Sequence, residues 1–106
     1  MMSPVILLGG SGFIGSAFAR ELAERGVDFT SISRAECDYT KFEIFTSLLK
    51  KGKPELVINA SGVTGNPNVD WCELHRKETI AGNIIAATAI SDACYSNGVI
   101  LGHVST

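Results

Sequence analysis

The chain has 106 residues, enough for one small domain, and its apolar fraction of 45% supports a packed core, which excludes a disordered chain. Its net charge is −2 and most of its nine basic residues are scattered, so no nucleic-acid interface is expected, and no apolar run is long enough to span a membrane. Three cysteines at unrelated spacings predict reduced thiols in a cytoplasmic protein and no metal site.

A glycine-rich turn follows the first predicted strand, Val5-Ile6-Leu7-Leu8, whose wholly apolar run is typical of a strand buried on both faces of a parallel sheet. In Gly9, Gly12 and Gly15, the first glycine can supply turn dihedrals, the second lets a ligand approach the backbone and the third lets the next helix pack closely. The amides at the helix start favour a phosphate. This context favours a dinucleotide-binding turn over a plain tight turn.

Helical and strand patterns alternate along the rest of the chain. The alternation predicts an α/β fold with a doubly wound parallel sheet (a Rossmann fold), helices on both faces, and a ligand at the carboxyl ends of the strands. The predicted elements after the first strand are a helix over residues 11–25 stopped by Gly26, a strand over 29–33, a helix opened by the capping-box pattern Thr40-Lys41-Phe42-Glu43 and ended by Gly52, a strand over 56–60, a loop over 61–69, a helix over 70–96 and a strand over 99–104.

The end of the second predicted strand bears on the choice of dinucleotide. A fold that binds NAD usually has an acidic residue there to hold the ribose hydroxyls, whereas this chain has Ser33 and Arg34. A guanidinium can bind a 2′-phosphate in bidentate fashion, with the serine hydroxyl beside it, which favours NADP over NAD. Two alternatives stay open: Arg34 is a solvated loop residue, or Glu36 acts as the missing acid.

Several motifs carry a family resemblance. The three glycines of the turn match Gly-x-x-Gly-x-x-Gly, and Asn59-Ala60-Ser61-Gly62 matches an Asn-Ala-(Ala/Ser)-Gly strand end. With these motifs the chain resembles the extended short-chain dehydrogenase/reductase (NAD-dependent epimerase/dehydratase) family. The resemblance implies that Asp38 meets the adenine and that Asn83 supports the active-site region. Together, pattern and resemblance predict these cofactor-binding residues: Gly9, Ser11, Gly12, Phe13, Ile14, Gly15, Ser33, Arg34, Asp38, Asn59, Ala60, Ser61, Gly62 and Asn83.

The segment INASGVTGNPNVDWCELHRKETI, residues 58–80, is similar to a narrower group within this family. Its members are the bifunctional 3,5-epimerase/4-reductases of 4-keto-6-deoxy nucleotide sugars, which make activated rhamnose; dTDP-4-dehydrorhamnose reductases are a more distant match. This resemblance implies NADP(H)-dependent reduction of a nucleotide-sugar substrate, a homodimer, and Thr106 as the catalytic residue that holds the sugar oxygen.

The chain departs from the family in its catalytic pair, Tyr-x-x-x-Lys. Tyr39 is followed four places later by Glu43, and Tyr95 by Val99, so neither tyrosine has the lysine that would lower its pKa. We therefore expect residues 1–106 to be the truncated NAD(P)-binding domain of a longer enzyme, inactive alone. One alternative is a non-catalytic NADP-binding subunit, similar to the regulatory subunit of methionine adenosyltransferase.

Overall fold

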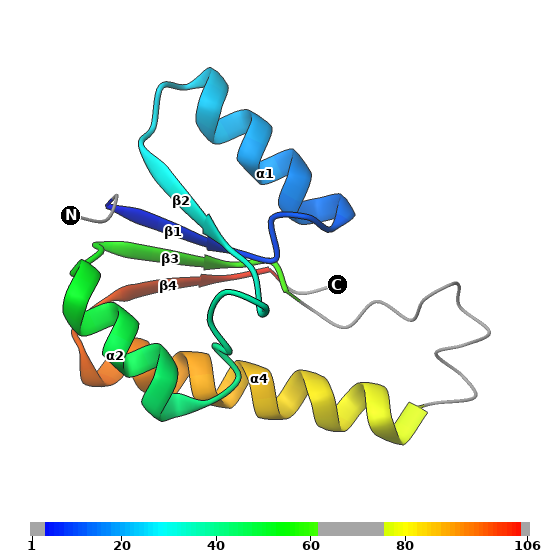
Figure 1. The fold of residues 1–106 in the computed structure, drawn as a ribbon. Coiled ribbons are helices and arrows are strands. Elements are labelled where there is room, and N and C mark those ends of the chain that lie inside the picture. The colour runs from blue at the N-terminus through cyan, green and yellow to red at the C-terminus, as the bar shows by residue number, and fades with distance from the viewer. Residues whose placement is uncertain (1–3, 62–75, 105–106) are drawn as a thin grey trace.

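The computed structural model describes residues 4–61 and 76–104, with the backbone alone for residues 76–85. Strands and helices alternate along these segments, as predicted (Figure 1). In chain order they are β1 (Val5–Leu8), α1 (Phe13–Glu24), β2 (Phe29–Ile32), α2 (Phe42–Gly52), β3 (Leu56–Asn59), α4 (Arg76–Ser96) and β4 (Ile100–His103).

The described strands form one four-stranded sheet in the order β2-β1-β3-β4, with every neighbouring pair parallel. Leu8 at the end of β1 lies opposite Ile32 on β2 and Asn59 on β3, so the carboxyl ends of the strands are level with one another. The chain passes from β1 to β2 on one side and then to β3 and β4 on the other. The strand order therefore reverses beside β1, which is where an open α/β sheet leaves a crevice for a ligand.

The helices cover both faces of the sheet. Helix α1 lies over one face, and α2 and α4 lie side by side over the other (Figure 1). The prediction of a doubly wound parallel sheet with helices on both faces is therefore confirmed.

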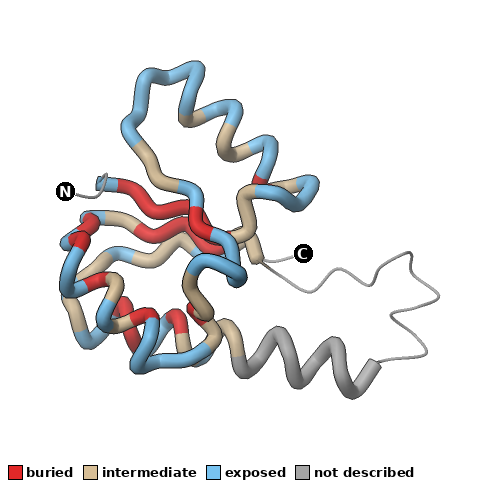
Figure 2. Tube along the Cα trace, in the orientation of Figure 1, coloured by how far each residue is buried: buried red, intermediate tan, exposed pale blue. Residues whose placement is uncertain are grey.

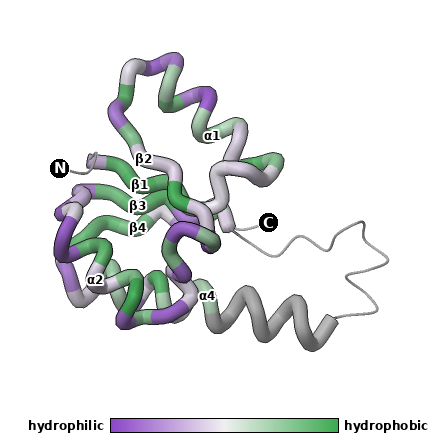
Figure 3. The backbone as a smooth tube through the Cα atoms, in the orientation of Figure 1, coloured by the Kyte–Doolittle hydropathy of each residue, from purple (hydrophilic) through white to green (hydrophobic). Residues whose placement is uncertain are grey.

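The core consists of two clusters, because successive residues of a strand point to opposite faces of the sheet. Ile6 and Leu8 belong to the cluster under α2 and α4, with Phe45 of α2 fully buried in it. Leu7 and Ile58 belong to the smaller cluster under α1. The central strands are accordingly buried in Figure 2 and apolar in Figure 3, as expected of a parallel sheet covered on both faces.

Helix α1 begins two residues later than the sequence pattern predicts, at Phe13 instead of Ser11. The amide of Gly12 donates to the carbonyl oxygen of Gly9 at 3.2 Å, so the chain completes a turn before the helix begins. At the other end, the prediction that Gly26 stops the helix is confirmed, since its φ is +69°. The Gly26 amide donates to Ala23 and the next amide donates to Leu22, which is the pattern of a Schellman motif.

The capping box predicted at Thr40 is wrong. Helix α2 has Lys41 at its N-cap, with no side-chain cap. The Thr40 hydroxyl donates instead to the Asp38 carboxylate, at 2.5 Å. At the end of α2, Gly52 is still helical and Lys53 takes the left-handed conformation, with φ of 46°. The strands β2, β3 and β4 are each one or two residues shorter than predicted.

Some predictions fall outside the described residues. These are the loop after Ser61 and the first part of the predicted 70–96 helix, up to residue 75. Within the described part, no helix is both long and apolar enough to cross a membrane. The same segments bring together no group of three or more His, Cys, Asp or Glu side chains that could hold a metal ion.

The conformation of Lys53 generates a stability prediction. The left-handed conformation costs a residue with a Cβ about 1–2 kcal/mol, and glycine avoids this cost. Glycine also raises the conformational entropy of the unfolded chain, which offsets part of the gain in stability. Lys53→Gly should therefore raise the free energy of unfolding in urea by about 0.5–1 kcal/mol. As a control, Lys51→Gly inside the last turn of α2 should lower it by about 1 kcal/mol. A loss of stability in both variants would contradict this explanation.

Candidate functional site

The turn between β1 and α1 brings three stretches of backbone into contact. Gly9 has a φ of +78°, and a Cβ there would lie 2.7 Å from the carbonyl oxygen of Ala60 and from the Cα of Ser61. A Cβ on Gly15 would overlap the Gly9 carbonyl group. The first glycine therefore supplies the turn dihedrals, and the third allows the helix to pack closely, as the sequence pattern predicts.

Gly12 is different, because space is open in front of it. A Cβ there would have one neighbour within 4 Å, the carbonyl oxygen of Gly9 at 3.6 Å. Gly12 is also the N-cap of α1, so the amides of the first helical turn have no acceptor inside the helix and no side chain of the N-cap to satisfy them. Uncapped amides at the positive end of a helix dipole form an anion-binding position.

Gly10 is a third constrained glycine of this turn, and the sequence did not indicate its role. A Cβ on Gly10 would overlap the hydroxyl of Ser31 on β2, so the turn lies directly against the neighbouring strand. The carbonyl of Gly10 also accepts a hydrogen bond from the Ser16 hydroxyl at 3.2 Å. This contact could not be predicted from the sequence, because it depends on which strand pairs with β1.

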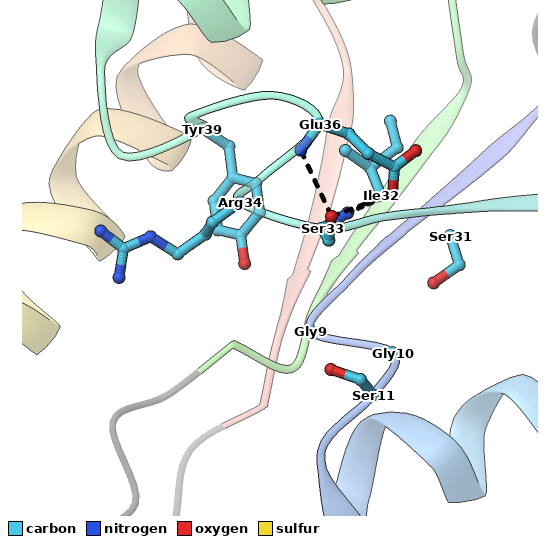
Figure 4. Close-up of a pocket in the computed structure, with 9 residues that line it drawn as sticks. All are labelled: Gly9, Gly10, Ser11, Ser31, Ile32, Ser33, Arg34, Glu36 and Tyr39. Atoms are coloured by element: carbon cyan, nitrogen blue, oxygen red, sulfur yellow. Dashed lines mark hydrogen bonds between the residues drawn. The ribbon is translucent and has the colours of Figure 1, made fainter.

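A cavity of about 410 Å³ lies between the glycine turn and the loop that follows β2 (Figure 4). It opens at the carboxyl ends of β1 and β2, and its size falls within the usual range for small-molecule sites, about 300–1,000 Å³. The residues that line it are Gly9, Gly10, Ser11, Ser31, Ile32, Ser33, Arg34, Glu36 and Tyr39.

The cavity brings together part of the predicted cofactor set. Four predicted residues line it (Gly9, Ser11, Ser33 and Arg34), while Gly12, Phe13, Ile14 and Gly15 form the adjacent start of α1. Asp38, Asn59, Ala60 and Ser61 do not line it. Gly62 and Thr106 lie outside the described residues, and Asn83 is on α4 where the backbone alone is described.

The loop after β2 is held by the hydrogen bonds of a capping box, formed here at a turn, which were not predicted from the sequence. The Ser33 hydroxyl and amide both donate to Oε1 of Glu36, at 2.9 and 3.2 Å. In return, the Glu36 amide lies 3.3 Å from the Ser33 hydroxyl and 3.1 Å from the Ser33 carbonyl oxygen. This is the Ser-x-x-Glu pattern of a capping box, so the sequence carried the signal. The Glu36 carboxylate is thereby fixed in the wall of the cavity.

Arg34 leaves the same loop in the opposite direction from Glu36 (Figure 4). Its charge acts on both Asp38 and Tyr39. Hydrogen bonds from Thr40, chiefly from its hydroxyl, hold the pKa of Asp38 below its usual value, and the charges of Lys41 and Arg34 lower it further. Burial raises the pKa of the Tyr39 hydroxyl, and its hydrogen bond with Ser61 and the charge of Arg34 partly oppose that rise.

A chain of hydrogen bonds connects Ser61 to the end of β4. Both the amide and the hydroxyl of Ser61 donate to Oδ1 of Asn59. Since Oδ1 of Asn59 faces these donors, its Nδ2 must face His103, whose Nδ1 lies 3.1 Å away and accepts. His103 therefore carries its proton on Nε2 in this arrangement. The Asn59 side chain, 3% exposed, holds the strand ends together.

The chain is similar in sequence to known proteins. A profile of the family described as "RmlD substrate binding domain" matches residues 2–106. The chain is 34% identical over 101 residues to a bifunctional dTDP-4-dehydrorhamnose 3,5-epimerase/dTDP-4-dehydrorhamnose reductase of Arabidopsis thaliana, a match that covers 95% of this chain and 33% of that protein. It is 26% identical over 106 residues to a dTDP-4-dehydrorhamnose reductase of Aggregatibacter actinomycetemcomitans, covering 99% of this chain and 35% of that protein.

Solved structures share the fold. A dTDP-4-dehydrorhamnose reductase of Bacillus anthracis, in complex with NADP, superposes with a TM-score of 0.74 at 23% identity. The match covers 95% of this chain and 35% of that chain. This chain thus spans about a third of the length of each of these three proteins.

The contrast between Gly15 and Gly12 can be tested by stability alone. Gly15→Ala places a methyl group against the Gly9 carbonyl and should lower the free energy of unfolding by about 2–3 kcal/mol or more. Gly12→Ala meets open space at an extended residue and should change it by less than about 1 kcal/mol. Urea denaturation measures both. Equal losses would mean that the turn does not constrain these two positions differently.

Proposed function

Because the chain belongs to the RmlD substrate binding domain family, we propose that it is the NADP(H)-binding part of a nucleotide-sugar oxidoreductase/epimerase. In this proposal the whole protein reduces the 4-keto group of a 4-keto-6-deoxy nucleotide sugar, as in rhamnose synthesis. The observation that carries the proposal is the open start of α1, whose uncapped amides lie beside a cavity at the carboxyl ends of the strands.

The residues present fit a dinucleotide. The open space in front of Gly12 lets a pyrophosphate reach the amides of the first turn of α1, where a side chain would otherwise intervene. The adjacent cavity then takes the adenosine, with Ser33 and Arg34 beside the 2′-phosphate of the ribose. We place Asp38 near the adenine, and Asn59-Ala60-Ser61-Gly62 along the cofactor, on the family resemblance.

The chemical step needs residues besides those of the cavity. The bound nicotinamide supplies the hydride for C4 of the sugar, and we assign to Thr106 the task of holding the sugar oxygen and to Asn83 the support of that region. Tyr39 does not qualify as the proton donor, because burial raises its pKa whereas a donor near neutral pH needs a lower one. We assign that role to a Tyr-x-x-x-Lys pair of the whole protein, outside these 106 residues.

The alternative, a non-catalytic NADP-binding regulatory subunit, uses the same cavity without the sugar. The relatives reported above are named as reductases, which favours the enzyme. For the whole protein we also propose a cytoplasmic location and a homodimer. The free thiols of Cys37 and Cys94 agree with a reducing compartment, and the homodimer rests on the family resemblance.

Gly12→Asp tests the anion site without disturbing the fold. Aspartate is a preferred N-cap residue, and the open space accepts its side chain, so the variant should keep the stability of the unaltered chain. Its carboxylate would stand where the pyrophosphate binds and should weaken NADPH about 100-fold or more, as measured by fluorescence titration. Gly12→Ala serves as the uncharged control. Unchanged NADPH affinity in the aspartate variant would remove the proposed binding position.

Arg34→Ala tests the choice of cofactor. Loss of a charge-assisted contact to the 2′-phosphate should weaken NADPH by about 1–3 kcal/mol and leave NADH nearly unchanged. Because Arg34 is exposed, the substitution should not disturb the core. Both affinities can be measured by calorimetric titration. Equal losses for the two nucleotides would show that Arg34 does not contact the 2′-phosphate.

A further inference from the structure

The loop after β2 contains a small anion-binding position that an internal group already fills. The amide and hydroxyl of Ser33 both donate to the same oxygen of Glu36, at 3.2 and 2.9 Å. A phosphate oxygen can also accept hydrogen bonds from two converging donors of this kind. The Glu36 side chain points away from Arg34 (Figure 4), and Glu36 lines the same cavity as Ser31 and Gly10.

The two hydrogen-bond donors of Ser33 cannot bind two anions at the same time. It has one hydroxyl proton and one amide proton, and both are engaged by Glu36. A 2′-phosphate that takes these donors must displace the Glu36 carboxylate, and it then has that like charge as its neighbour. A ribose with a free 2′-hydroxyl meets no such conflict, because a carboxylate accepts hydrogen bonds from a diol.

We propose that the Glu36 carboxylate is an internal competitor of the 2′-phosphate for the amide and hydroxyl of Ser33, and that Glu36 is the residue that limits the preference of this chain for NADP(H) over NAD(H). The inference rests on the proposed dinucleotide site and adds a specificity-determining residue to it. Arg34 and Glu36 then act in opposite senses from the same loop, the guanidinium favouring the phosphate and the carboxylate opposing it.

Glu36→Gln is the direct test. The amide oxygen of glutamine can still accept from both Ser33 donors, so the capping box is kept while its negative charge is removed. We expect NADPH to bind the variant about 5- to 30-fold more tightly than the unaltered chain, and NADH to bind equally or a few-fold more weakly. Glu24→Gln, at the exposed far end of α1, is the matched control for the change in net charge and should alter neither affinity.

Calorimetric titration of the full 106-residue chain with each nucleotide measures both affinities at low and at high salt. Repulsion between exposed charges is screened by ions, so the gain in NADPH affinity should shrink as the salt concentration rises. A change that is equal for NADPH and NADH, or a weaker NADPH complex, would overturn the role of Glu36. If the unaltered chain binds neither nucleotide, the proposed function itself fails instead.

Discussion

The contact of backbone with backbone at the end of β1 is the constraint on which the rest of the site depends. The turn at Gly9, the start of α1 at Gly15 and the end of β3 at Ala60 come so close together that neither Gly9 nor Gly15 leaves room for a Cβ. This contact fixes the direction in which α1 leaves the sheet, and hence where its free amides point. It also sets the distance between the turn and β2, and so the shape of the cavity wall. The proposed dinucleotide site is thus formed mainly by backbone atoms, and the glycines contribute to it by having no side chain.

Features that depend on near neighbours in the chain could be predicted from the sequence. The apolar strands, the alternation with helices and the spacing of Gly9, Gly12 and Gly15 are all local patterns, and they were sufficient to predict the fold class. Other features depend on a choice between equivalent patterns. Ser-x-x-Glu at Ser33 and Thr-x-x-Glu at Thr40 are alike on paper, yet the first forms a capping box and the second does not.

The difference between those two patterns is physical. The Thr40 hydroxyl has a stronger local partner, the Asp38 carboxylate two residues earlier, whereas Ser33 has no such competitor within its own turn. The contact of Gly10, in the turn after β1, with Ser31 of β2 could not be predicted from the sequence, because it requires the pairing of β1 with β2 to be known first. Asn59 illustrates a further case: its position in a family motif indicated the cofactor, while its buried side chain connects Ser61 to His103.

The parallel order of the strands also governs how the chain can fold. No neighbouring pair in the sheet can be closed by a hairpin, because each pairing spans a whole helix; Val5 at the start of β1 pairs with Phe29 and with Leu56. Such distant pairings form slowly, because the chain loses the entropy of closing a long loop before the contacts between the strands can compensate for that loss. The glycine turn is braced by Ala60 and Ser61, which arrive only with β3. We therefore expect the proposed nucleotide site to form only when β3 joins the centre of the sheet, and not before it.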